Sequence, residues 1–140
     1  MSAVPLLGHT SLDDILAYLP DGPATVRDFL ASASALATIL PTSQYFLNLC
    51  QDRYRFSVGL AAGLLGERTS LQPSSQSVET LRQIRHQHPD VFCLCDSAFD
   101  SLDLPRVDFP DRLAAPSEAF ARIPDISAEY TVKALHLDVI

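Results

Sequence analysis

Residues 45–72 constrain the fold of this chain more than any other stretch. They read YFLNLCQDRYRFSVGLAAGLLGERTSLQ: a short apolar run, a polar turn, an amphipathic run rich in small residues, and a second short apolar run. Short apolar runs without alternation are typical of parallel strands that are buried on both faces. Asp52 is a suitable N-cap for a helix over Arg53–Leu65. The stretch therefore predicts a strand at 45–50, a helix, and a second strand at 69–72 in a parallel sheet.

Small residues stand at spacings of three and four along the predicted helix, namely Gly59, Ala62, Gly63 and Gly66. Glycine in a helix interior costs about 1 kcal/mol relative to alanine, so the glycines need a compensating reason. Close packing of the helix backbone onto a sheet supplies it. The same spacing occurs in membrane helix pairs, but this apolar segment is shorter than the roughly 20 residues that a bilayer requires. We therefore expect no membrane span.

A hairpin and a helix are indicated ahead of this unit. Residues 4–12 are either coil or an edge strand. Residues 14–26 place proline, aspartate and glycine between two short runs, which predicts a small antiparallel hairpin. The following helix, over 26–40, begins at a capping box formed by Thr25 and Asp28 and repeats its apolar residues at helical spacing.

The alternation of strands and helices continues after residue 72. Ser77 is a suitable cap for a helix over 78–87, and the apolar run at 91–95 predicts a third parallel strand. Right-handed crossovers between such elements give one parallel sheet that is covered on both faces. The fold class that we expect is therefore α/β: a Rossmann-like, mostly parallel sheet with helices on both faces, plus a small N-terminal hairpin.

The patterns weaken beyond residue 96. We expect one α/β domain over residues 1–140, with a loop-rich part at 97–129. Its predicted features are a strand at 106–109, one or two helical turns within 112–123, a break at Pro124 and Asp125, and a terminal strand within 130–140.

Composition places the chain among globular proteins and argues against several partners. Apolar residues make up 47% and charged residues 19% of the 140 residues. The formal net charge of -7 argues against nucleic acid, since phosphate backbones are bound by clustered Lys and Arg. The N-terminus has no basic segment ahead of an apolar one, so we expect no secretory signal. Three cysteines, an odd number, fit free thiols in a reducing, cytoplasmic compartment.

A metal site is the first chemical hypothesis to weigh, because His86, His88, Cys93 and Cys95 lie close together in the sequence. An extended strand holds the two cysteines on one face, but about five residues at roughly 3.3 Å each separate His88 from Cys93. Zinc sites need ligands that converge. We therefore predict buried thiols beside a solvated helix end, and no metal-binding residue.

An acidic stretch, comprising Asp96, Asp100, Asp103, Asp108 and Asp111, follows the third strand. It lacks the tight alternation and the central glycine of a calcium-binding loop. The alternative, a solvated loop whose charges repel one another, is the one that we predict.

The remaining candidates are nucleophiles and surface charges. Ser74, Ser75 and Ser77 are predicted to be turn and cap residues, because no G-x-S-x-G motif surrounds them. Arg53 and Arg55 are expected to form surface ion pairs with Asp52, each worth on the order of 0.5 kcal/mol.

The turn Cys50-Gln51-Asp52 occupies the place where a parallel sheet normally hosts a ligand or a reactive thiol. It has no glycine, however, and presents an acidic residue where a phosphate requires backbone amides. We predict that Cys50 is a packed or half-exposed structural residue and that the turn is not a phosphate site.

Residues 14–96 resemble the beginning of the large N-terminal domain of AMP-forming acyl-CoA synthetases and related adenylating ligases. The segment NLCQDRYRF, residues 48–56, is particularly similar to acyl-CoA synthetase-like proteins of bacterial polyene and fatty-acid-type pathways. The features that carry the resemblance are a hairpin turn at Asp21-Gly22, a capped helix, a strand with Asn48, the helix at 56–66, a strand ending in Pro73, Ser77 followed by Glu79, and a strand ending in Asp96.

The resemblance implies ATP-dependent activation of a carboxylate to an acyl-adenylate, and then transfer to a thiol. In that family a Ser/Thr/Gly-rich phosphate-binding loop with a lysine follows the part matched here. At that place residues 128–136 read AEYTVKALH, and no glycine follows Gly66. No catalytic, cofactor-binding or metal residue can therefore be transferred, and we expect no cofactor.

The sequence thus leaves two functional hypotheses. The first is an N-terminal fragment of such a ligase that is not catalytically competent alone, whose partner is the remainder of the ligase or a second copy of the chain. The alternative is a free-standing α/β interaction or regulatory module that self-associates through an exposed apolar face or sheet edge.

Overall fold

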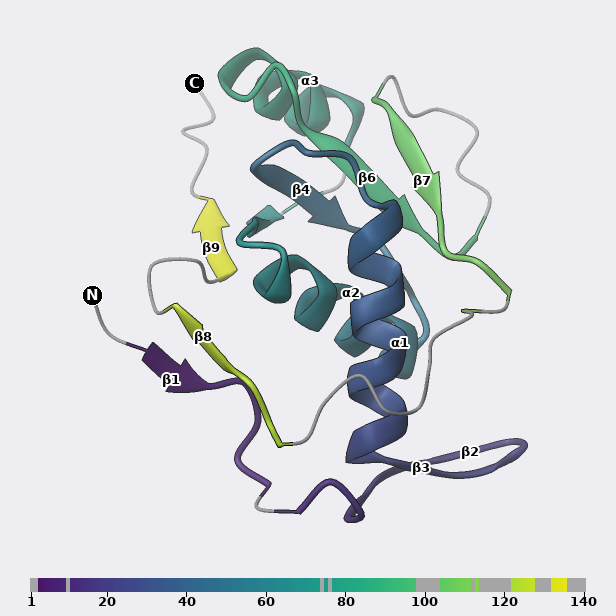
Figure 1. Ribbon diagram of the computed structural model, residues 1–140. Coiled ribbons are helices and arrows are strands. Elements are labelled where there is room, and N and C mark those ends of the chain that lie inside the picture. Colours follow the sequence, from purple (N-terminus) through teal and green to yellow (C-terminus); the bar gives the residue numbers. More distant parts are fainter. Residues whose placement is uncertain are drawn as a thin grey trace.

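Five parallel strands form the central sheet of the computed structural model, in the order β7-β6-β4-β5-β9 (Figure 1). Their bounds are Tyr45–Asn48 for β4, Thr69–Pro73 for β5, Phe92–Cys95 for β6, Arg106–Asp108 for β7 and Val132–Leu135 for β9. The structure describes residues 3–9, 11–73, 75, 77–97, 104–111, 113, 122–127 and 132–135.

Helices cover both faces of the sheet. Helix α1 spans Val26–Ile39, α2 spans Arg53–Leu65 and α3 spans Val78–Gln87. One buried cluster joins α1 and α2 to Phe46 and Phe92, and a second joins α3 to Leu47 and Cys93. Because successive strand residues point to opposite faces, these two clusters lie on opposite sides of the sheet (Figure 1). The predicted α/β fold class is confirmed.

Helix α2 lies directly on the sheet because it carries glycines where it meets the strands. A Cβ atom added to Gly63 would stand 2.5 Å from Cε1 of Phe46, and one added to Gly59 would stand 2.7 Å from Cδ2 of Leu94. Contacts this close do not occur between real side chains. The prediction that the glycines serve close packing is therefore confirmed.

Helix α1 packs against α2 and is bounded as predicted. The backbone N–H of Asp28 donates to Oγ1 of Thr25 at 3.2 Å, and the N–H of Thr25 donates to Oδ2 of Asp28 at 3.0 Å. The rings of Phe29 in α1 and Tyr54 in α2 meet edge to face, with centroids 5.9 Å apart. The capping box fixes where α1 begins, and the apolar stripe fixes which side faces α2.

The guanidinium of Arg68, which follows α2, donates hydrogen bonds to carbonyl oxygens at the C-terminal end of α1. Arg68 is only 8% exposed. Its Nε and Nη2 donate to the carbonyl oxygen of Pro41 at 2.9 and 2.6 Å, and Nη2 also donates to the carbonyl of Leu40 at 3.3 Å. Burial lowers the pKa of Arg68 from its usual value. Carbonyls that a helix end leaves without partners thus receive a charged donor.

Two antiparallel pairs lie outside the main sheet. The predicted hairpin is confirmed as β2, Ile15–Leu19, and β3, Gly22–Thr25. Gly22 has φ +130°, which favours glycine at this turn. Strand β1, Ala3–Pro5, pairs with β8, Asp125–Ser127.

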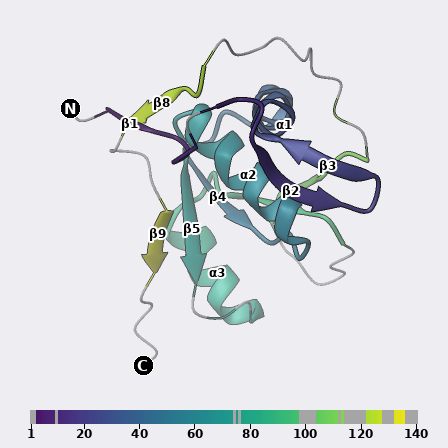
Figure 2. The same cartoon turned by 90° about the horizontal axis from the view of Figure 1, so that it is seen from below.

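The C-terminal part differs from the expectations in one element. We predicted a break at Pro124 and Asp125 and no strand directly after it, whereas β8 begins at Asp125. A three-residue strand is too short to show alternation, so its partner β1 decides the pairing. The strand predicted at 106–109 is confirmed as β7, and β9 lies beside β5 within the range predicted for a terminal strand (Figure 2). The helical turns predicted within 112–123 fall mostly outside the described residues.

Among the described residues, no helix has the length and apolar character that crossing a membrane requires.

Candidate functional site

The order of the strands defines where a ligand would bind in this fold. From β4 the chain passes through α2 to β5 on one side, and α3 then returns it to β6 on the other side of β4. The direction of winding therefore reverses between β4 and β6. In open α/β sheets, ligands bind in the crevice outside the carboxyl ends of the strands at such a point.

A cleft of about 650 Å³ lies at this reversal point. Its walls come from the β2–β3 turn, from α1 and α2, from the end of β6 and from the segment after β7. Tyr54 and Phe109 supply aromatic surface. Burial raises the pKa of Tyr54. The polar and charged residues along the cleft include Asp21, Gln51, Asp52, Arg55, Asp96 and Asp111.

The carboxylate of Asp96 occupies the backbone N–H groups at the start of α2, which could otherwise bind an anion. Its Oδ1 accepts the backbone N–H of Gln51 at 2.9 Å, and its Oδ2 accepts the N–H of Asp52 at 2.9 Å. These amides stand at the positive end of the α2 dipole, where an open structure of this kind attracts phosphate. In this structure the carboxylate of Asp96 takes that place.

The side chain of Asn48 also stabilises the turn between β4 and α2. This side chain is 5% exposed, and its Nδ2 donates to the carbonyl of Phe56 at 2.9 Å. The Oδ1 atom accepts the N–H of Cys50 at 3.3 Å. The turn between β4 and α2 is therefore fixed by two side chains, Asn48 and Asp96, that approach it from different strands.

Cys50 is buried in the turn, with its Sγ 4.0 Å from the carbonyl oxygen of Leu94. Burial, together with the nearby charge of Asp96, raises the pKa of this thiol to about 12. Because the thiolate is the reactive form, a thiol with so high a pKa is a poor nucleophile. The geometry agrees with the structural role that we predicted for Cys50.

The charged side chains at the N-terminus of α2 make other contacts than the predicted ion pairs. Asp52 is the N-cap, with its Oδ2 accepting the N–H of Arg55 at 2.9 Å. The guanidinium of Arg55 lies over the ring of Phe109, 5.3 Å from its centroid. The predicted ion pairs of Asp52 with Arg53 and Arg55 do not occur among the described residues. The prediction was wrong: the Asp52 carboxylate caps the helix, and the guanidinium of Arg55 lies over the ring of Phe109.

The acidic stretch is not the uniform solvated loop that we predicted. Asp96 bridges two elements, Asp108 lies in β7 and pairs with Arg106 at 2.6 Å, and Asp111 lines the cleft. Asp100 and Asp103 lie outside the described residues. Only the position of Asp96 at the end of a parallel strand could have indicated its role from sequence.

The structure separates the four residues that the sequence suggested as possible metal ligands, His86, His88, Cys93 and Cys95. His86 is exposed on α3, and the ring of His88 lies 4.2 Å from that of Tyr45, whereas Cys93 and Cys95 are buried in β6. Within the described part of the chain, no three His, Cys, Asp or Glu side chains could hold a metal together. The structure brings together the two thiols and neither histidine.

The serines have local roles, as predicted. Ser77 caps α3 by accepting the N–H of Thr80 at 3.2 Å, and Ser75 accepts the N–H of Ser77 at 3.1 Å. Ser74 lies outside the described residues.

Comparisons with known proteins agree with the architecture. No protein-family model and no curated protein sequence matches the chain. By fold, however, the chain is similar to part of a solved coenzyme A synthetase, in agreement with the fold that the resemblance implies.

The solved structures that it matches are of O-succinylbenzoate coenzyme A synthetase (MenE) from Bacillus subtilis. The complex with AMP matches with a TM-score of 0.60 and 18% identity, over 77% of this chain and 32% of the synthetase. A double mutant bound to its product analogue OSB-NCoA matches with a TM-score of 0.61 and 18% identity, over 91% and 28%. The chain thus spans about a third or less of the length of these synthetases.

Proposed function

We propose that this α/β unit is the counterpart of the N-terminal part of an AMP-forming acyl-CoA synthetase, and that it does not activate a carboxylate by itself. The observation that carries the second half of the proposal is the carboxylate of Asp96. It accepts the N–H groups of Gln51 and Asp52 at the reversal point of the sheet. A phosphate would have to displace this carboxylate to use these amides.

The charge of the cleft supports the same conclusion. Four carboxylates, those of Asp21, Asp52, Asp96 and Asp111, line it together with one guanidinium, that of Arg55. The polyphosphate of ATP would be repelled by this excess of negative charge. Phosphate-binding loops use glycines so that their amides can converge, and the sequence has no glycine after Gly66.

Exchange of labelled pyrophosphate into ATP tests the proposal, because every acyl-adenylate-forming enzyme catalyses it. We expect the purified chain to give no carboxylate-dependent exchange above the rate without protein, with a panel that includes fatty acids, aryl acids and o-succinylbenzoate. The synthetase from Bacillus subtilis serves as the positive control. Exchange that requires both this chain and one of the carboxylates contradicts the proposal.

A second candidate function, self-association, is favoured by the exposed side chains of the hairpin. Tyr18 is 81% exposed and Ile15 is 47% exposed, both in β2. Large apolar side chains on a two-stranded ribbon are a frequent site of contact between copies. Light scattering over a range of protein concentrations tests it. A mass that doubles with concentration, and returns to that of the monomer in Tyr18→Ser, supports this function, and a monomer at every concentration argues against it.

We also propose that the protein works in a reducing compartment such as the cytoplasm. Cys50, Cys93 and Cys95 are all free thiols in the structure. Unpaired cysteines are kept reduced in that compartment.

A further inference from the structure

The cleft at the reversal point of the sheet has the size and the lining of a site for a small organic molecule. Its volume of about 650 Å³ lies within the range of small-molecule sites, about 300–1,000 Å³. Apolar surface comes from Leu19 in β2, from Val58 in α2 and from Leu113. The rings of Tyr54 and Phe109 add aromatic surface. An apolar ligand body can therefore contact several walls of the cleft at once.

One aromatic ring of the cleft already contacts a cation. The guanidinium of Arg55 lies over the ring of Phe109, 5.3 Å from its centroid. The backbone that carries this ring is fixed, because the N–H of Phe109 donates to the carbonyl of Cys95 at 2.7 Å. The face of an aromatic ring carries partial negative charge and attracts cations. The aromatic surface of the cleft thus favours positive charge as well as apolar groups.

The carboxylates that line the cleft fall into two groups. Asp52 and Asp96 accept backbone N–H groups at the start of α2. Asp21, in the β2–β3 turn, and Asp111, after β7, line the cleft from two other segments. Neither of these two side chains has a hydrogen bond or an ion pair with another described residue. Their charges are therefore available to a ligand.

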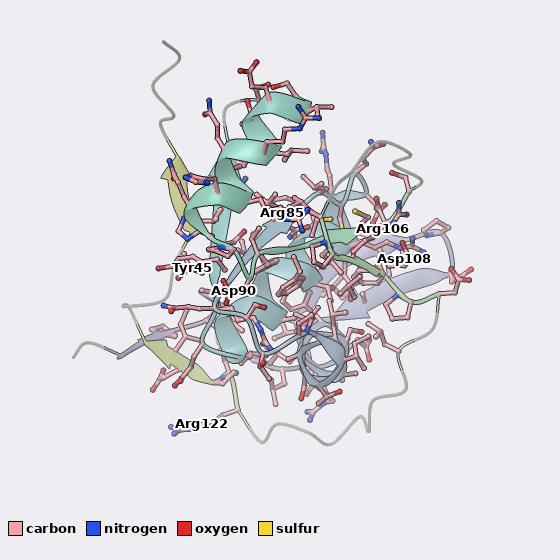
Figure 3. All side chains as sticks on the ribbon, turned by 90° about the horizontal axis from the view of Figure 1, so that it is seen from above. Tyr45, Arg85, Asp90, Arg106, Asp108 and Arg122 are labelled. Carbon is pink, nitrogen blue, oxygen red and sulfur yellow. The ribbon has the colours of Figure 1, made fainter. Side chains whose placement is uncertain are left out.

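The guanidinium of Arg106, which borders an adjoining cavity of about 270 Å³, is engaged by other groups. Its Nε lies 2.6 Å from Oδ1 of Asp108, and its Nη2 donates to the carbonyl of Ser97 at 2.7 Å (Figure 3). Arg55 is the one cationic side chain among the described residues that line the cleft itself. The negative charge of the cleft is therefore only partly offset.

We propose that the cleft binds a small organic ammonium ion, with its apolar body against Tyr54 and Phe109 and its charge toward the carboxylates of Asp21 and Asp111. A cleft lined mainly by one sign of charge concentrates ligands of the opposite sign. A bare metal ion fits less well, because no three His, Cys, Asp or Glu side chains among the described residues could hold one together. The inference goes beyond the proposed function and needs no ATP, so the pyrophosphate exchange assay does not decide it.

Three indole derivatives with the same apolar body test the proposal on the unaltered chain. Tryptamine ends in an ammonium group, tryptophol in a neutral hydroxyl and indolepropionate in a carboxylate. The protein has no tryptophan, so the fluorescence anisotropy of the indole reports on the ligand alone. We expect tryptamine to bind about 10-fold more tightly than tryptophol, and indolepropionate not to bind. Equal affinities for tryptamine and tryptophol, or no saturable binding of tryptamine, overturn the proposal.

Substitution of the two available carboxylates locates the site. Asp21→Asn and Asp111→Asn should each weaken the binding of tryptamine about 3- to 5-fold, as expected for partly exposed ion pairs, and leave that of tryptophol unchanged. Asp90→Asn is the matched control, because it removes the same charge just before β6, whereas the cleft lies at the carboxyl ends of the strands. An equal weakening in Asp90→Asn would mean that net charge alone attracts tryptamine, which contradicts the site.

Arg55→Met should have the opposite effect. It removes the one cation of the described cleft wall and frees the face of Phe109, so tryptamine should bind about 3-fold more tightly. A purely structural role of Arg55 would give no gain in affinity. Circular dichroism checks that each variant is folded, and unchanged or weaker binding of tryptamine by folded Arg55→Met overturns the proposal.

Discussion

Oδ2 of Asp96 accepts a hydrogen bond of 2.9 Å from the backbone N–H of Asp52, so a carboxylate at the end of β6 holds the start of α2. Its other oxygen accepts the N–H of Gln51 at the same distance. The bridge joins the two strands between which the winding of the sheet reverses. The carboxylate also interacts favourably with the positive end of the α2 dipole.

Asp96→Ala should therefore destabilise the fold. It leaves two amides without their charged acceptor, and hydrogen bonds to charged groups contribute about 1.5–3 kcal/mol each when they are well shielded. Because Asp96 is partly exposed, water replaces some of the loss, and we expect a decrease of about 2 kcal/mol in the free energy of unfolding. Urea denaturation followed by circular dichroism measures it, since the chain has no tryptophan.

Asp111→Ala is the matched control, because it removes another carboxylate that lines the same cleft. Its effect should stay within about 0.5 kcal/mol, as expected for a surface substitution. An equal loss of stability in the two variants would show that negative charge in the cleft, and not the Asp96 bridge, matters for folding.

Gly63→Ala should destabilise the protein through a direct clash. The new methyl group would stand 2.5 Å from Cε1 of Phe46, which is fully buried and stacked on Phe92 with centroids 5.5 Å apart. Overpacking of a core typically costs about 1–3 kcal/mol. We expect a loss in this range, offset only slightly by the better helix propensity of alanine.

Gly8→Ala provides the control, since a methyl group there meets no atom within 4 Å. Combining Gly63→Ala with Phe46→Leu should cost less than the sum of the two single changes, because the smaller side chain relieves the clash. Strict additivity of the two changes in free energy would contradict direct contact as the cause.

Helix starts could be predicted from the sequence because their determinants are local. Thr25, Asp52 and Ser77 each accept an N–H group from the residue three positions later, as capping residues do. The glycines of α2 were equally informative, because their cost in a helix demands close packing. Capping residues and helix glycines can be recognised within a single segment, because each acts on the helix in which it stands.

The contacts of the candidate site could not be predicted in this way, because they join distant segments. Asp96 is 45 residues from Gln51, and Arg68 is 27 residues from Pro41. Their side chains look like ordinary surface charges until the order of the strands and the packing of α1 on α2 are known. For the same reason β8 was missed, since its strand character depends on β1 at the other end of the chain.

Arg68→Met should destabilise the protein although it keeps most of the apolar side chain. The carbonyl oxygens of Pro41 and Leu40 lose a charged donor in a site where Arg68 is only 8% exposed. We expect a loss of about 2 kcal/mol, within the range for hydrogen bonds to charged groups. Arg68→Lys should recover less than half of it, because an ammonium group cannot reproduce the forked geometry of a guanidinium. Full recovery by lysine would mean that charge alone is sufficient.

The stability of the protein should fall in alkaline solution partly through Cys50. Burial, with a further contribution from Asp96, raises the pKa of this thiol from 9.0 to about 12 in the folded state. Below pH 9 the thiol is neutral in both the folded and the unfolded chain, so it has no effect on the pH dependence. Between pH 9 and 12 the unfolded chain releases a proton that the folded chain retains, and unfolding becomes more favourable as the pH rises.

The slope from one such group reaches at most about 1.4 kcal/mol per pH unit. Other groups also titrate in this range, so the informative quantity is the difference between the wild-type chain and Cys50→Ala. Urea denaturation at several values from pH 8 to 10.5 should show the wild-type chain losing stability more steeply above pH 9. Parallel curves for the two proteins would indicate that the Cys50 thiol ionises as readily in the folded chain as in the unfolded one.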